Sequence, residues 1–122
     1  MRPAGLLFFL LLAACEPQAP PWHNHEPYPP LISGPPEVFA GVPATFDVTV
    51  CDPDGQRLRV YLAWGDGDTN DYGEFVYSGE TVHFEHTYLT QDTFYITGRC
   101  HDPEPLFSDW SAAKQVVVLP PR

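Results

Sequence analysis

Hydrophobic and polar residues alternate with a period of two along much of the chain after residue 37. The clearest case is residues 45–50, where Phe46, Val48 and Val50 share one face. Because successive side chains of a β-strand point to opposite faces of a sheet, this pattern predicts a half-buried strand. Similar runs predict strands at 57–64, 74–77, 81–86, 92–100 and 114–119. No stretch has the 3.6-residue period of an amphipathic helix, so the pattern predicts an all-β fold.

Turn-forming residues separate these runs. Residues 52–55 read Asp-Pro-Asp-Gly and residues 65–68 read Gly-Asp-Gly-Asp, and both sequences favour tight turns because proline presets φ and glycine accepts a positive φ. With the alternating residues 38–42, the chain carries about seven short strands at roughly ten-residue spacing. This spacing predicts an immunoglobulin-like β-sandwich over residues 37–119.

The first 15 residues have the pattern of an export signal. Residues 4–14 are apolar, and this run is shorter than the roughly 20 residues that span a membrane. Residues 12–15, Leu-Ala-Ala-Cys, resemble a bacterial lipobox. The resemblance implies that residues 1–14 are a cleaved lipoprotein signal peptide. It also implies that Cys15 receives a lipid that includes palmitate. The alternative is an ordinary signal peptide with a coincidental cysteine.

These features predict a location in the cell envelope, outside the cytoplasm, with the membrane contacted through the N-terminal lipid. Glu16 is not the aspartate that often marks retention in the inner membrane, so the outer membrane is mildly preferred. Residues 16–36 are rich in proline, which favours polyproline II over a helix or a sheet ladder. We therefore expect residues 15–36 to be a lipid-anchored linker. Residues 22–26, Trp-His-Asn-His-Glu, form either a solvated polar patch or a weak metal site.

The order of several short motifs resembles the polycystic kidney disease (PKD) family. The motifs are Asp-Pro-Asp-Gly at 52–55, Trp-Gly-Asp-Gly-Asp-Thr at 64–69, His-Thr-Tyr at 86–88, Thr-Phe-Tyr-Ile at 93–96, Asp102, and Ser-Asp-Trp-Ser at 108–111. The resemblance covers about residues 35–119. It implies a PKD-like immunoglobulin-like domain that contacts proteins or carbohydrates.

Two cysteines are additions to this pattern. Cys51 precedes Trp64 and Cys100 follows it, which resembles the cysteine, tryptophan, cysteine order of immunoglobulin domains. The resemblance implies a disulfide between Cys51 and Cys100, which an exported compartment permits. However, Cys51 is out of phase with the inward residues of 45–50. The alternative is two free, buried thiols.

The chain is strongly acidic, with 16 Asp and Glu against 6 Lys and Arg and a net charge of -10. This balance argues against nucleic acid, which requires clustered basic residues. The acidic side chains gather in the turns, and their oxygens suit Ca²⁺. The candidate ligands are Asp52, Asp54, Asp66, Asp68 and Asp102. The competing interpretation is that these residues cap turns and no cofactor binds.

No arrangement of nucleophile and base is evident, and the chain is not expected to be an enzyme. The aromatic residues Tyr72, Phe75, Tyr77 and Trp110 are candidates for a binding surface, although sandwich cores and edges use such residues too. The preferred hypothesis is a non-catalytic, lipid-anchored envelope module that spaces or contacts envelope proteins or polysaccharide. The alternative is a Ca²⁺-binding envelope module.

Overall fold

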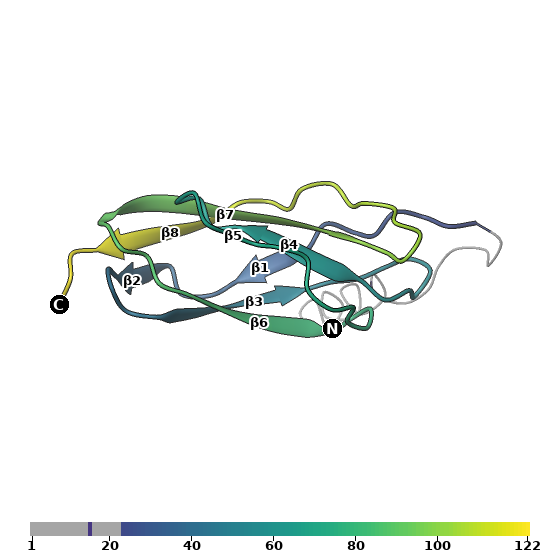
Figure 1. Cartoon of the computed structure of the whole chain (residues 1–122), viewed down its shortest axis with the longest axis horizontal. Helices are drawn as coiled ribbons and strands as arrows, with labels where there is room; N and C mark the ends of the chain where they lie inside the picture. The colour runs from purple at the N-terminus through teal and green to yellow at the C-terminus, as the bar shows by residue number, and fades with distance from the viewer. Residues whose placement is uncertain (1–14, 16–22) are drawn as a thin grey trace, which may run out of the picture.

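Eight strands form in the computed structural model, which describes Cys15 and residues 23–122 (Figure 1). They are β1 (Leu31–Ser33), β2 (Glu37–Phe39), β3 (Ala44–Thr49), β4 (Arg59–Ala63), β5 (Thr69–Asn70), β6 (Thr81–His86), β7 (Asp92–His101) and β8 (Lys114–Leu119). The expected signal peptide, residues 1–14, lies outside the described residues. No helix in the described part of the chain is long and apolar enough to cross a membrane.

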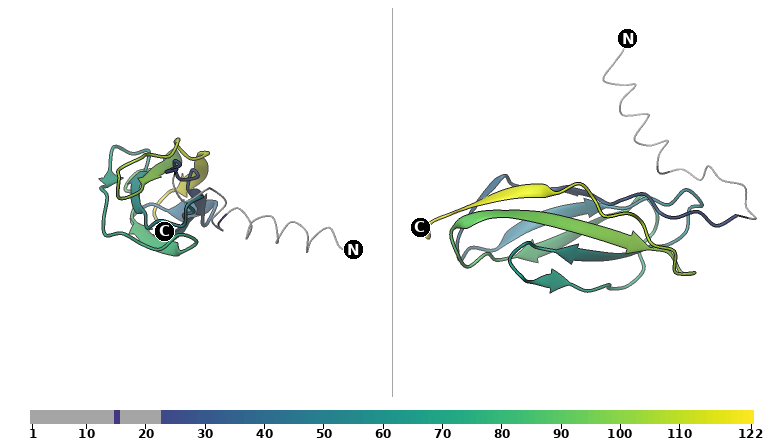
Figure 2. Two further views of the ribbon diagram at one scale, coloured as in Figure 1. Left: turned by 90° about the vertical axis from the view of Figure 1, so that its right-hand side faces the viewer. Right: turned by 90° about the horizontal axis from the view of Figure 1, so that it is seen from above.

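The strands form two sheets that pack face to face. One has three strands in the order β1-β3-β6, and the other has five in the order β2-β8-β7-β4-β5. Most neighbours are antiparallel, but β2 runs parallel to β8. The expected all-β immunoglobulin-like sandwich is therefore confirmed. In Figure 1 and in the right view of Figure 2, the C-terminus lies at the end of the sandwich away from the segment that precedes β1.

The core consists of the alternate residues that the sequence pattern placed inward. Phe46 pairs with Phe84 across β3 and β6, and the Phe46 ring lies 5.6 Å from that of Trp64. Trp64 is fully buried, and its carbonyl accepts a 2.7 Å hydrogen bond from the Tyr88 hydroxyl. Burial of such large apolar side chains is the dominant stabilising contribution to the fold.

Part of the expected linker belongs to the sandwich. Leu31 pairs with Thr49, so β1 is an edge strand of the smaller sheet, and Ile32 packs against the core. The expectation that 16–36 forms no sheet ladder is wrong, because the prolines flank β1 and leave its backbone donors intact. The backbone N–H of Tyr28 also bonds the carbonyl of Cys51 at 3.0 Å.

Residues 74–77, expected to form a strand, make only an isolated bridge. Leu58 and Val76 exchange two backbone hydrogen bonds there, at 2.8 and 2.7 Å. The turn at Ser78 and Gly79 ends the pairing after this bridge. β5 forms instead within the segment that connects β4 to this bridge, and it pairs with the last residues of β4.

Candidate functional site: an arginine and aromatic face

The outer side of the larger sheet carries basic and aromatic side chains. In β4 the buried residues Val60 and Leu62 alternate with Arg59 and Tyr61. The neighbouring strand β7 places its own outward residues beside them, because Arg59 pairs with His101 and Tyr61 pairs with Arg99. Directly opposed residues of antiparallel strands contact each other, so the two strands together build one surface.

Two loops add further rings to this surface. Tyr72 lies 5.3 Å from Tyr61 and 4.8 Å from His101, measured between ring centroids. Phe107 lies 4.8 Å from His101, and Trp110 lies 5.9 Å from Tyr61. The connected rings are Tyr61, Tyr72, Phe75, His101, Phe107 and Trp110.

Three guanidinium groups lie over these rings. Arg57 and Arg59 are 5.1 and 5.2 Å from the centroid of Phe75. Arg99 lies 4.4 Å from the centroid of Phe107 and 5.1 Å from that of Trp110. These distances are those of cation–π contacts. We call the connected rings and the three arginines together the arginine–aromatic face.

None of these arginines has a carboxylate partner among the described residues, whose salt bridges all join a histidine to an aspartate. The Nε of Arg99 is buried and has no hydrogen-bond partner. Burial raises the pKa of Tyr72, and the nearby Arg99 charge opposes that rise. The tyrosine hydroxyl therefore remains a neutral donor at physiological pH.

The structure brings together three of the four aromatic residues that the sequence nominated. Tyr72, Phe75 and Trp110 belong to the arginine–aromatic face, and Trp110 is 49% exposed. Tyr77 is 73% exposed and belongs to the turn before β6, apart from the connected rings. Sequence analysis missed the other members of the face, which are Arg57, Arg59, Tyr61, Arg99, His101 and Phe107. The alternation in residues 92–100 could have indicated Arg99, because it places this residue on the face of the strand opposite the buried residues.

A histidine side chain contacts the acidic turn that follows β4. The Nε2 of His86 donates to Asp66 Oδ2 at 2.8 Å, and the His86 ring stacks on Trp64 with centroids 4.4 Å apart. Burial raises the pKa of Asp66, but hydrogen bonds from His86 and from the Asp68 backbone N–H outweigh it, so the pKa is lowered. Gly65 has φ +90°, and a Cβ there would lie 2.7 Å from the Tyr95 carbonyl oxygen.

The aspartates in the acidic turns at the other end of β4 are buried and have no histidine partner. Asp52 and Asp102 have no exposed surface. Each carboxylate accepts two backbone N–H groups of its own turn, from Asp54 and Gln56 or from Glu104 and Leu106. Desolvation raises the pKa of Asp52, since burial outweighs these hydrogen bonds.

Three oxygens near these turns are buried and unpartnered. They are Asp52 Oδ1, Asn24 Oδ1 and Gln56 Oε1. Asn24 belongs to this group because its Nδ2 donates to Asp102 Oδ2 at 3.0 Å. Every one of them is an acceptor, so these three oxygens lack donors. We call Asn24, Asp52 and Asp102 the buried acidic cluster.

The five aspartates proposed as calcium ligands do not converge. In the described part of the chain, no three or more His, Cys, Asp or Glu side chains form a group that could hold a metal. Asp66 and Asp68 follow β4, whereas Asp52 and Asp54 precede it. Asp54 contacts the Nδ1 of His25 at 3.2 Å. The segment with both histidines therefore packs on the domain through Asn24 and His25.

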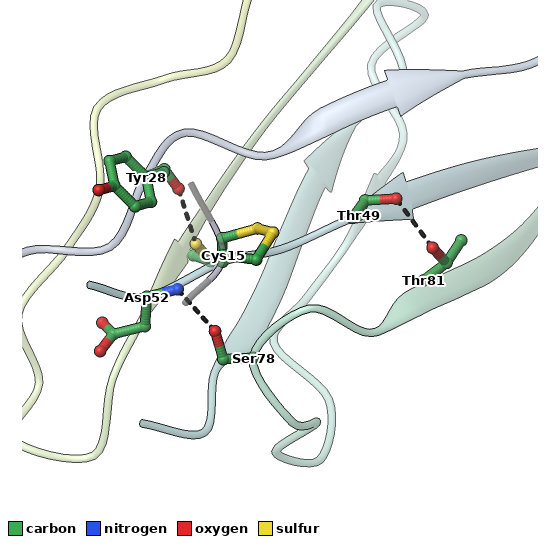
Figure 3. The surroundings of a disulfide bond; sticks show 8 residues. Cys15, Tyr28, Thr49, Asp52, Ser78 and Thr81 are labelled. Carbon is green, nitrogen blue, oxygen red and sulfur yellow. Dashed lines mark hydrogen bonds between the residues drawn. A yellow bond between two sulfur atoms is a disulfide. The ribbon is translucent and has the colours of Figure 1, made fainter. Parts of the chain in front are cut away.

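The predicted disulfide between Cys51 and Cys100 is wrong, because Cys51 is bonded to Cys15 (Figure 3). Cys51 shares the outward phase of Thr49, and both line an apolar groove that Cys15 also lines. Cys100 is a free, buried thiol, and its Sγ lies 3.5 Å from the Tyr28 carbonyl oxygen. Burial raises the pKa of Cys100 to about 11, which makes it a poor nucleophile.

Comparison with solved structures finds a similar domain. The chain is similar to the PKD domain of an M14-like peptidase from Thermoplasmatales archaeon SCGC AB-540-F20, with 28% identity and a TM-score of 0.76 over 82% of this chain and all of that domain. This likeness supports a PKD-like domain. No family model matches the chain, and neither does any curated protein.

A second structural neighbour shows the fold alone. It is the CARDB domain of a Pyrococcus furiosus protein, solved in complex with di-metal ions, with 18% identity and a TM-score of 0.59 over 80% of this chain and 96% of that one. Both neighbours have the β-sandwich fold, and the PKD-domain neighbour supports a PKD-like module here. Within it, the arginine–aromatic face and the buried acidic cluster are the two candidate sites.

Proposed function

We propose that this chain is a non-catalytic module of the cell envelope that contacts carbohydrate or protein through the arginine–aromatic face. The observation that carries the proposal is the gathering of six rings and three arginines on one side of the larger sheet. Exposed aromatic and arginine side chains are the residues enriched where proteins bind partners.

The face is tested by comparing two exposed aromatic residues. A glycan array and a pull-down of envelope proteins are run with the unmodified chain, Trp110→Ala and Tyr77→Ala. Trp110 belongs to the face and Tyr77 does not, although Tyr77 is more exposed. We expect Trp110→Ala to lose captured ligands and Tyr77→Ala to keep them. If both assays are empty, or both variants lose binding equally, the proposal fails.

The membrane anchor is part of the same proposal. The lipobox-like residues 12–15 and the apolar residues before them support lipid attachment at Cys15. A sulfur cannot carry both a thioether and a disulfide, so the lipid-anchored chain would have Cys51 without Cys15 as partner. Mass spectrometry of chain extracted from membranes tests this. A diacylglycerol adduct on a chain that begins at Cys15 supports the anchor, whereas an unmodified, disulfide-bonded chain excludes it.

Calcium binding is a second candidate, and the buried acidic cluster favours it. Asp52 and Asp102 are buried carboxylates, and Asp52 Oδ1 and Asn24 Oδ1 are buried without donors. A hard cation such as Ca²⁺ prefers carboxylate and amide oxygens. These residues would hold the ion, which would supply the positive charge that the cluster lacks and would tie the segment before β1 to the turns after β3 and β7.

Thermal unfolding with and without Ca²⁺ tests this candidate. At a Ca²⁺ concentration about 100-fold above Kd, binding should stabilise the fold by about 2.7 kcal/mol. Asp102→Asn should abolish most of that gain, because it removes one charged ligand. Asp109→Asn is the matched control, since Asp109 lies on the exposed part of the same loop. The absence of a Ca²⁺-dependent shift in the unmodified chain would exclude calcium.

A further inference from the structure

The arginines of the arginine–aromatic face are the feature least explained by folding. A chain with 16 acidic residues offers many internal partners, yet the close carboxylate contacts of this kind among the described residues join an aspartate to a histidine and none involves an arginine. Arg59 uses its Nε to donate to the Gly73 carbonyl, and the Nε of Arg99 has no partner. A guanidinium has five N–H donors in a fixed plane, so the one bond from Arg59 to Gly73 uses only a small part of this donor capacity.

The rings hold these guanidinium groups in place. A guanidinium lying over an aromatic ring keeps its N–H edges free for in-plane hydrogen bonds, while the ring restricts its rotation. Arg99 contacts both Phe107 and Trp110, and Arg59 contacts Phe75. The planar fork of arginine matches the two oxygens of a carboxylate better than a lysine would. Arg59 and Arg99 are therefore the groups of the face that suit a carboxylate.

Exposed rings lie next to these cationic groups. Trp110 and Phe107 are 49% and 36% exposed. Flat aromatic surfaces pack against the apolar C–H side of sugar rings, and the hydroxyl groups of Tyr61 and Tyr72 can hydrogen-bond to sugar hydroxyls. A ligand that satisfies both features has sugar rings for the aromatic surface and carboxylates for the arginines. In a chain of sugars, successive carboxylates can reach both arginine sites.

We propose that the arginine–aromatic face binds an acidic polysaccharide whose sugars carry carboxylates. The inference rests on the proposed function, because it specifies the ligand of the same face. The chain's net charge of -10 repels a polyanion at long range. At physiological ionic strength this repulsion decays over about 8 Å, so the arginines in direct contact decide the interaction. Binding should accordingly be weak at low salt and should not fall steeply as salt is added.

The test uses the full chain and three soluble probes in isothermal titration calorimetry. Polygalacturonate carries carboxylates on sugar rings, a neutral galactan has rings alone, and polyglutamate has carboxylates alone. We expect polygalacturonate to bind at least tenfold more tightly than either of the others. Arg99→Gln should weaken polygalacturonate binding at least tenfold. Arg122→Gln is the matched control, because Arg122 lies over Phe39 in β2, outside the face, and it should leave binding unchanged.

The outcomes separate this inference from the proposed function. If galactan or polyglutamate binds as tightly as polygalacturonate, the proposal that the ligand is an acidic polysaccharide is overturned. If Trp110→Ala still abolishes capture in the glycan array or the pull-down, the interaction face survives that result. Equal losses in Arg99→Gln and Arg122→Gln indicate general charge attraction and overturn the inference. If none of the probes binds and Trp110→Ala changes no captured ligand, both proposals fail.

Discussion

Two acidic regions at opposite ends of β4 differ in how their carboxylates are satisfied. Asp66, which follows β4, accepts a hydrogen bond from His86, and the histidine itself stacks on the buried Trp64. Asp52, which precedes β4, is more deeply buried but contacts only backbone donors. Its second oxygen has no partner. The pKa of Asp66 is lowered, whereas that of Asp52 is raised.

The difference shows that similar turn sequences serve different purposes. Both turns combine aspartate with glycine, and both use an aspartate side chain to cap a backbone N–H. At the His86 end the protein supplies a side-chain N–H donor, so the carboxylate contributes to stability. At the Asp52 end the protein supplies no such donor to Asp52, so the ionised carboxylate costs stability until a cation or a proton arrives.

The largest expected effect comes from removing the histidine. His86→Ala should lower the free energy of unfolding by about 3 kcal/mol, because it leaves a cavity beside Trp64 and an unpaired Asp66. Denaturant unfolding followed by tryptophan fluorescence measures the change. His83→Ala is the matched control, since His83 pairs with Asp47 on the exposed surface of β6 and should cost less than about 0.5 kcal/mol.

Equal losses in the two histidine variants would contradict the distinction between a buried and an exposed pair. If His86→Ala does not fold, a second variant still tests this distinction. His86→Gln retains a donor within reach of Asp66 while removing the stacked ring. It should unfold at an intermediate denaturant concentration if the contact with Trp64 and the hydrogen bond both contribute.

Substitution of the two aspartates by asparagine should have effects of opposite sign. Without Ca²⁺, Asp52→Asn should stabilise the fold by about 1 kcal/mol, because it removes a buried charge and keeps an oxygen for the backbone donors. Asp66→Asn should destabilise it by about 1 kcal/mol, because a neutral amide is a weaker partner for His86. Denaturant midpoints in the presence of a chelator give both values.

A destabilising Asp52→Asn in chelator would mean that the charge is compensated in the fold, which would remove the argument for a cation there. With Ca²⁺ present, the sign at this site should reverse, since the unmodified carboxylate then has its partner. Asp66→Asn should respond to Ca²⁺ as the unmodified chain does. This arrangement separates a metal effect from a general effect of lost charge.

The sandwich could be predicted because its strands follow a period of two. Phe46, Val48 and Val50 were assigned inward by alternation and are fully buried. The turn motifs similarly marked the acidic loops on each side of β4. These features are local, and burial on one face of a sheet specifies them strongly. The extra strand β1 was missed because proline content obscured the three residues that pair with β3.

Contacts between distant segments could not be predicted in the same way. Whether Cys51 meets Cys15 or Cys100 depends on where the segment before β1 returns to the sandwich, which no local pattern encodes. The same return brings Asn24 to Asp102. For the arginine–aromatic face, alternation gave the outward side of β4 and β7, but the positions of Phe107 and Trp110 depend on a loop without periodicity.

The smallest expected effect is on pH dependence: the carboxylates at the two ends of β4 should change the folding stability in opposite directions as the pH rises. Asp66 has a folded pKa below its ordinary value of 3.8. Its contribution is therefore complete above pH 3.8 and is lost as the pH falls through the folded value. Asp52 has a folded pKa above 3.8, so its ionisation reduces stability as the pH rises through 3.8 toward the folded value. In the unmodified chain the two contributions partly cancel.

The variants remove one contribution each, so unfolding free energies between pH 3 and pH 7 should diverge from the unmodified chain in opposite directions. Relative to that chain, Asp52→Asn should gain stability as the pH rises and should lose its advantage in acid. Asp66→Asn should show its deficit at neutral pH, and the deficit should shrink below pH 3.8. Each change should stay below about 1 kcal/mol. Parallel curves for both variants would mean that the two carboxylates have the same environment, and the contrast between the ends of β4 would then be lost.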